Sequence, residues 1–128
     1  MRALLDTHAL LWWFSDDPAL TRPVRKIIGD MKNTVVVSAA SAWEIATKVR
    51  LGKLPTGAGL AADFTGYIER EYFQLLPISV EHALRAGLLP GSHRDPFDRT
   101  LIAQAQAENL PILSKEVIFD AFGLRRIW

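Results

Sequence analysis

The sequence predicts a three-layer α/β fold, in which a mainly parallel sheet of four to five strands is flanked by helices. Short apolar runs alternate with stretches of helical periodicity along the chain. The run 34–38 is dense in β-branched residues and uncharged, which is typical of a strand covered on both faces. The opening run ends at a carboxylate, Asp6, where open parallel sheets bind their ligands.

Length and composition indicate one globular domain spanning residues 1–128, with no repeat, low-complexity tract or linker. The formal net charge of +1 provides no general attraction to nucleic acid, so any such affinity requires a local basic patch. The chain has no cysteine, which excludes disulfides, zinc–thiolate sites and thiol nucleophiles. A site for a metal that binds through oxygen ligands remains possible.

The N-terminal apolar run ends after Phe14 and is interrupted by Asp6 and His8, so it is too short to span a bilayer. It also lacks the basic leader and the small-residue cleavage site of a secretion signal. We therefore expect a cytoplasmic protein with no membrane partner.

The first half of the chain is predicted to contain two strands and three helices. In order, these are a strand ending at Asp6, helix 8–14, helix 22–30, strand 34–38 and helix 39–51. Asp6 or Thr7 can cap the first helix, and Gly52 ends the third. Each strand is followed by a helix, as the right-handed crossovers of a parallel sheet require.

The second half repeats this alternation. The predicted elements are helix 60–72, strand 73–78, a helix from Ser79, helix 97–108, strand 110–114, helix 115–122 and strand 125–128. Ser79 and His82 are spaced as in a capping arrangement. The segment 89–96 contains two prolines and a glycine, so we expect it to be irregular.

Three carboxylates fall at one edge of the predicted sheet. Asp6 ends the first strand, Glu44 lies in the helix after the second strand, and Asp98 lies in the first turn of helix 97–108. Glu44 has apolar neighbours, which leaves few places for its charge unless it faces a site. Crowded carboxylates repel one another, and Mg²⁺ or Mn²⁺, which prefer oxygen ligands, removes that repulsion. The three acids therefore predict a catalytic, metal-binding site for phosphodiester hydrolysis.

Each acid also has a structural explanation when taken singly. Asp6 can cap a helix, and Asp98 is favoured by the helix dipole without any function. Glu44 can form a plain i,i+4 ion pair with Lys48, although Lys48 is equally placed to hold a phosphate. The other candidates for substrate binding are Arg99, Lys115, Thr7 and Ser38. We expect His8 to lie in the core or to contact the metal ligands without binding the metal itself.

Three segments occur in a set order and spacing, namely Leu4–Trp13, Val37–Ile45, and His93–Arg99 continued by Leu101–Ala105. Together they resemble the PIN-domain toxins of bacterial VapBC-type toxin–antitoxin systems, and the resemblance runs from Met1 to Trp128. It implies a PIN-like fold and a metal-dependent endoribonuclease that cleaves single-stranded RNA or RNA loops. It also implies a small antitoxin partner that holds the enzyme inactive.

By position in that family, Asp6, Glu44 and Asp98 would be the metal-binding acids. Family members commonly add a fourth acid after the fourth strand in a Thr-x-Asp pattern, where this chain has Ser114-Lys115-Glu116. The resemblance therefore leaves Glu116 and Asp95 as candidates for a fourth ligand. We further expect a homodimer, and we expect the helix that carries Trp12 and Trp13 to contribute to the antitoxin surface or the dimer seam.

Three other functions compete with this interpretation. A receiver-like phosphoacceptor requires adjacent acids after the first strand and an Asp at the end of the third, and the chain has neither. A mononucleotide-binding module requires a glycine-rich turn after the first strand, which is also missing. A PIN fold that has lost catalysis and only binds RNA or protein remains open from the sequence.

Overall fold

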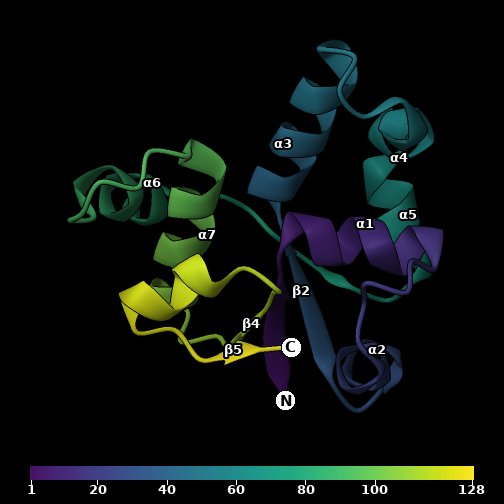
Figure 1. Cartoon of the computed structure of the whole chain (residues 1–128), viewed down its shortest axis with the longest axis horizontal. Coiled ribbons are helices and arrows are strands. Elements are labelled where there is room, and N and C mark those ends of the chain that lie inside the picture. Colours follow the sequence, from purple (N-terminus) through teal and green to yellow (C-terminus); the bar gives the residue numbers. More distant parts are fainter.

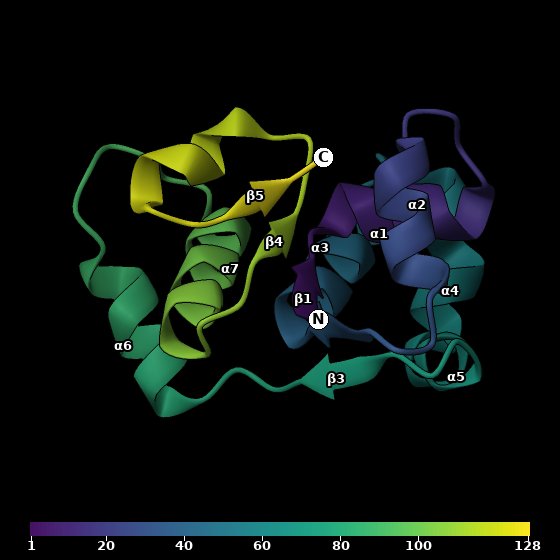
Figure 2. The ribbon, with the colours of Figure 1, turned by 90° about the horizontal axis from the view of Figure 1, so that it is seen from below.

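The computed structural model describes residues 1–128 and is built around one five-stranded sheet. The strands are β1 (Arg2–Leu5), β2 (Thr34–Ser38), β3 (Gln74–Leu76), β4 (Ile112–Leu113) and β5 (Arg126–Ile127). Their order is β3-β2-β1-β4-β5, and every neighbouring pair is parallel. Figure 2 shows β3 and β5 on opposite sides of the central strand β1. The predicted parallel α/β sheet is confirmed.

The register of the central strands brings their carboxyl ends to one level. Leu5 of β1 lies opposite Val37 of β2 and Leu113 of β4. The residues that follow these three positions are Asp6, Ser38 and Ser114. One acid and two hydroxyl groups are thus placed side by side at the strand ends, where parallel sheets bind ligands.

Both faces of the sheet are covered, as expected for strands that are apolar throughout. One core contains Leu5 and Val37 and is covered by α1 (Thr7–Ser15), α2 (Arg22–Gly29), α3 (Ala39–Arg50), α4 (Ala58–Ala62) and α5 (Phe64–Arg70). The other core contains Leu4 and Val36 and packs against α7 (Pro96–Ala107) and a 3-10 helix, Val117–Phe122. Figure 1 shows these two groups of helices on opposite sides of the strands.

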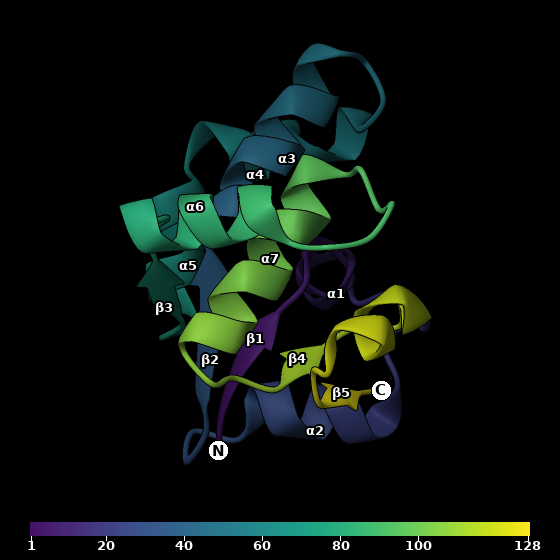
Figure 3. The same cartoon turned by 90° about the vertical axis from the view of Figure 1, so that its left-hand side faces the viewer.

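The helix ends follow the local signals in the sequence. Asp6 caps α1, Thr21 caps α2, and α6 (Val80–Leu88) begins with a capping box between Ser79 and His82. Helix α6 lies on α7, on the outside of the second face (Figure 3). The two longest helices, α3 and α7, have 12 residues each, and no helix combines the length and apolarity needed to cross a membrane.

Helix 60–72 was predicted as one continuous element, but the structure divides it into α4 and α5. Asp63 lies between them with φ −142° and ψ 50°, outside the helical region. A Cβ atom on Gly66 would lie 2.4 Å from Asp63 Oδ2, so glycine allows this carboxylate to fold over the first turn of α5. The predicted single helix is therefore wrong at Asp63.

Three strands, β3, β4 and β5, are shorter than predicted. Strand 73–78 is reduced to Gln74–Leu76, 110–114 to Ile112–Leu113 and 125–128 to Arg126–Ile127. Pro77 and Pro111 flank two of these strands, and proline has no N–H to extend a ladder. The predicted helix 115–122 forms a 3-10 helix instead.

The two tryptophans of α1 are both half-buried. Trp12 packs between His8 and Trp128, with ring centroids 5.6 and 5.7 Å away, and Trp13 lies 6.2 Å from the ring of Phe73. The most exposed apolar stripe lies elsewhere, on α6, where three side chains are at least 61% exposed: Val80, Leu84 and Leu88. The sequence pattern pointed to Trp12 and Trp13 of α1 as the apolar contact surface and did not indicate this stripe on α6.

Candidate active site

A cavity of about 400 Å³ is lined by residues that follow β1 and β4 and by residues of α3 and α7. It gathers all five carboxylates that the sequence predicted as metal ligands: Asp6, Glu44, Asp95, Asp98 and Glu116. Thr7, His8, Lys48 and His93 also line it. The predicted acids, which are far apart in the sequence, therefore share one site.

Asp6 is the most deeply buried of these acids, with 3% of its surface exposed. Its Oδ1 accepts a hydrogen bond from the Ala9 N–H at 2.7 Å, which is the α1 cap, and its Oδ2 accepts one from the Ser114 hydroxyl. Burial raises the pKa of Asp6 from its ordinary value of 3.8 to about 6, although both hydrogen bonds oppose the shift. The functional and the capping explanations of Asp6 are thus compatible, because only Oδ1 takes part in the cap and Oδ2 does not.

Glu44 extends from α3 into the cavity and is buried there. Its Oε2 accepts a hydrogen bond from Lys48 Nζ at 2.6 Å. This is the i,i+4 ion pair that the sequence suggested, but it does not lie on a plain surface, because the Glu44 side chain is only 8% exposed. Lys48 therefore compensates a buried charge inside the acidic cavity.

Asp98 lies in the first turn of α7, and its Oδ2 is 2.9 Å from His93 Nε2. Burial raises the pKa of Asp98, and the hydrogen bond to His93 opposes that shift. The charges of Asp95 and Glu44 also raise this pKa, so Glu44 and Asp98 are close enough to repel one another. Asp95 itself caps α7 by accepting from the N–H groups of Phe97 and Asp98.

The carboxylates share the cavity but do not converge on one point. No group of three or more acidic or histidine side chains is arranged to hold a metal ion as it stands. Each central acid instead has its own partner, namely Ser114 for Asp6, Lys48 for Glu44 and His93 for Asp98. Glu116, after β4, is near enough for its charge to raise the pKa of Asp6. The donor chemistry fits a divalent cation, which would have to displace these partners.

The predicted substrate-binding residues divide into two groups. Lys48 and Thr7 line the cavity, and the Thr7 hydroxyl is hydrogen-bonded to Ser41 at 2.9 Å. Ser38 does not line it, since its buried hydroxyl caps α3 and donates to Gln104. Lys115 is exposed and also lies outside the cavity lining.

Arg99 does not face the cavity either, which corrects its proposed role. Its guanidinium donates to the carbonyl oxygens of Ala86, Gly87, Leu89 and His93 at 2.7–3.3 Å. Adjacent helical residues point about 100° apart, so the neighbour of a site residue turns to another face. Arg99 thus anchors the irregular segment 89–95 to α6 and α7.

The sequence did not predict that two groups, Ser114 and His93, contact the acids. Ser114 follows β4, and the strand-end argument that selected Asp6 applies equally to its hydroxyl. The contact between His93 and Asp98 had no clear signal, because it depends on the shape of an irregular loop. His8 also differs from expectation, since it is exposed at the cavity wall and stacks on Trp12.

Comparison with known proteins identifies the family to which this fold belongs. A family model described as "PIN domain" matches residues 3–123, so the chain belongs to the PIN domain family. The sequence resemblance to that family is therefore confirmed.

Two proteins similar to this chain, one relative in sequence and one solved structure, are more specific than the family match. Ribonuclease VapC16 of Mycobacterium tuberculosis is 44% identical over 59 residues, which cover 46% of this chain and 40% of that protein's length. A solved structure of VapBC2 from Rickettsia felis, bound to a DNA fragment from their promoter, matches with a TM-score of 0.67. That match covers 99% of this chain and 98% of the other at 16% identity, and it supports the fold alone.

Proposed function

We propose that this PIN domain is a Mg²⁺- or Mn²⁺-dependent endoribonuclease and the toxin of a toxin–antitoxin pair. The observation that carries the proposal is the single cavity lined by five carboxylates and Lys48 at the strand ends. The similarity to a protein named as a ribonuclease supports the reaction class. The substrate is an RNA phosphodiester bond.

Asp6, Glu44 and Asp98 would hold the cation, with Glu116 or Asp95 as a further ligand. A cation bound there would supply a nucleophilic water and stabilise the charge that develops on the phosphate. Burial and mutual repulsion raise the proton affinity of Asp6 and Asp98, and these are the conditions under which cation binding is most favourable. With a pKa of about 6, Asp6 is mostly ionised at neutral pH.

The remaining cavity residues bind and orient the substrate. Lys48 is the cation best placed to contact the phosphate backbone, because it is part-exposed and lines the acidic cavity. If a metal takes over Glu44, the ammonium group of Lys48 becomes available to the RNA. Thr7 offers a hydroxyl at the cavity wall, and His93 orients the carboxylate of Asp98.

We place the protein in the cytoplasm with two protein partners. One is a cognate antitoxin, by analogy with the VapBC2 structure, whose description names a VapBC assembly on DNA. The other is a second copy of this chain, which would cover the exposed apolar stripe of α6. Sedimentation of the wild type against Leu84→Glu tests the dimer, and an unchanged mass in the variant would argue against this seam.

The function is tested by incubating the protein with RNA in Mg²⁺ and in EDTA. We expect cleavage only with Mg²⁺, and loss of at least about 100-fold of the rate in Asp6→Asn and Asp98→Asn. Glu69→Gln removes an exposed acid of α5 outside the cavity and serves as the matched control with full activity. Circular dichroism verifies that each variant is folded.

The alternative is a PIN fold that binds RNA or protein without cleaving it. The separate partners of the three acids favour this alternative, because no ligand set is preassembled. Wild-type protein that binds RNA but cleaves none in Mg²⁺ or Mn²⁺ would establish it. Cleavage that is equally fast in Asp6→Asn would instead place the catalytic centre outside this cavity.

A further inference from the structure

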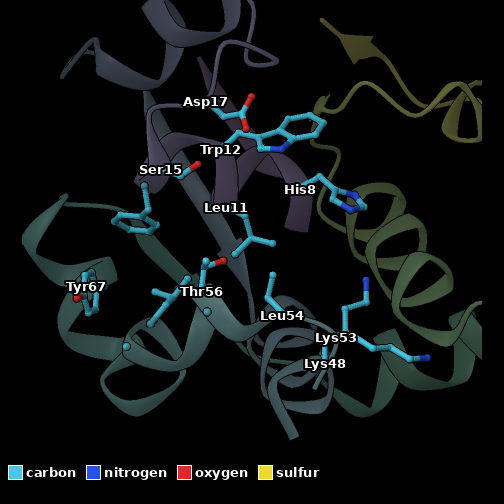
Figure 4. Close-up of a pocket in the computed structure, with 14 residues that line it drawn as sticks. His8, Leu11, Trp12, Ser15, Asp17, Lys48, Lys53, Leu54, Thr56 and Tyr67 are labelled. Atoms are coloured by element: carbon cyan, nitrogen blue, oxygen red, sulfur yellow. The ribbon is translucent and has the colours of Figure 1, made fainter. Parts of the chain in front are cut away.

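A second cavity, of about 610 Å³, adjoins the acidic one. It lies between α1 on one side and the end of α3 with the segment through α4 and α5 on the other (Figure 4). His8 and Lys48 line both cavities, so the two hollows are neighbours with a shared wall. A polymer whose reacting bond lay in the acidic cavity could continue directly into this one.

The lining combines aromatic and cationic groups. His8 and Trp12, one turn apart on α1, are stacked with an interplanar angle of 29°. Lys53 and Lys48 lie on the wall opposite His8, as Figure 4 shows. Lys53 is exposed and forms no ion pair, whereas Lys48 is paired with Glu44. The cavity thus offers a stacking platform facing a free ammonium group.

We propose that this second cavity is a subsite for the nucleotide that flanks the scissile phosphate. Its base stacks on the free face of His8, whose other face lies on Trp12, and its phosphate contacts Lys53, with Lys48 between the two cavities. The proposal rests on the proposed function, because it assumes a single-stranded RNA substrate. It assigns substrate contacts to His8 and Lys53, which the acidic site does not require, and it makes Trp12 the support of the His8 ring.

The lysines and the aromatic side chains lie on different sides of the second cavity. This arrangement fits a nucleotide better than an acidic or a purely apolar ligand. Asp17 lies on the α1 side, near Trp12 and away from Lys48 and Lys53 (Figure 4). Its Oδ1 already accepts a hydrogen bond from the Ala19 N–H at 2.8 Å. A phosphate is therefore attracted to the lysine side, next to the acidic cavity, and a base to the aromatic side.

The test compares a single-stranded RNA dinucleotide with a tetranucleotide. Calorimetric titration in EDTA measures affinity without cleavage. We expect the wild type to bind the tetranucleotide more tightly, and Lys53→Ala and His8→Ala to weaken this binding by about 5-fold or more. Both side chains are exposed, so neither substitution threatens the fold. Lys32→Ala removes an exposed lysine outside both cavities and is the matched control.

Salt dependence provides a second readout. If Lys53 contacts a phosphate, Lys53→Ala reduces the slope of log affinity against log salt by about 0.7, the value for one contact to a single strand. Lys32→Ala leaves the slope unchanged. A purely structural effect of the substitution would not alter the slope in this way.

The binding results for these variants test the proposed subsite separately from the proposed nuclease function. If Lys53→Ala and His8→Ala behave like Lys32→Ala, the subsite is wrong, even when Mg²⁺-dependent cleavage is observed. If the two variants lose affinity for the tetranucleotide while no RNA is ever cleaved, the subsite stands and the nuclease assignment fails. Equal affinity of the wild type for the dinucleotide and the tetranucleotide would overturn the phosphate contact of Lys53, because the dinucleotide carries the flanking base but lacks the next phosphate.

Discussion

Lys48 Nζ lies 2.6 Å from Oε2 of Glu44, inside a cavity that is otherwise dominated by carboxylates. Removal of one partner of a buried ion pair leaves an uncompensated charge, so the Glu44 carboxylate depends on the ammonium group of Lys48 for its compensation. A divalent cation must compete with this ammonium group for the same oxygen. In the proposed enzyme Lys48 would therefore oppose metal binding in the free protein, and it would become available to a phosphate once a metal is bound.

The first prediction concerns this competition. Lys48→Met removes the competing charge but keeps the aliphatic stem, so we expect it to bind Mn²⁺ more tightly than the wild type does, by about 5-fold or more. The same variant should cleave RNA more slowly, because a phosphate contact is lost. Calorimetric titration with Mn²⁺ measures the affinity. Glu44→Gln is the matched control and should shift the affinity in the opposite direction; weaker Mn²⁺ binding by both variants would show that Lys48 does not compete.

The second prediction concerns the effect of pH on the metal-free protein. Burial raises the pKa of Asp6 from 3.8 to about 6, so between these values the folded state binds more protons than the unfolded state. The contribution of Asp6 to stability is therefore full below pH 4 and is lost as the pH rises through 6. The loss amounts to about 3 kcal/mol.

Asp6→Asn isolates this contribution, because the other titrating groups are common to both proteins. We expect the free energy of unfolding of the variant, relative to the wild type, to increase from pH 4 to pH 7 in the absence of metal. Urea denaturation at several pH values measures it. Mg²⁺ should reduce the difference at pH 7 by stabilising only the wild type. A difference that is constant with pH would refute the raised pKa.

The third prediction concerns Arg99. Its guanidinium donates to four backbone carbonyl groups, so Arg99→Ala should lower the free energy of unfolding by about 2 kcal/mol. At temperatures where the variant is folded, the KM for RNA should be unchanged, because Arg99 does not line the cavity. An increase in KM of ten-fold with unchanged stability would restore Arg99 to the substrate-binding residues.

Much of the fold was predictable because strand and helix signals in this chain are local. The β-branched run of β2, the capping box of α6 and the apolar surroundings of Glu44 each indicated the correct element or location. The break at Asp63 was not predictable, since the helical spacing of apolar residues continues across it and the fit of the Asp63 carboxylate over Gly66 appears only in three dimensions.

The acids of the site were predicted from the sequence, but the positions of the residues around them were predicted less well. Asp6 follows β1, Asp98 lies in the first turn of α7 and Glu44 lies within α3, the helix that follows β2, so the topology brings all three to one edge of the sheet. The directions in which the Arg99 and Ser38 side chains point depend on the polar groups that surround them in three dimensions, so the sequence did not predict them. The aromatic and basic second cavity is lined by residues of α1, α3, α4 and α5 and of the segment between α3 and α4, and no single stretch of sequence indicates it.

The central claim, that the acids of the cavity together hold one divalent cation, is tested most directly by anomalous diffraction from crystals soaked in Mn²⁺. The account predicts a peak inside the cavity within bonding distance of Asp6, Glu44 and Asp98, with the Glu44–Lys48 contact opened. Soaked crystals that show no peak there, with Asp6, Glu44 and Asp98 still bound to Ser114, Lys48 and His93, would contradict it.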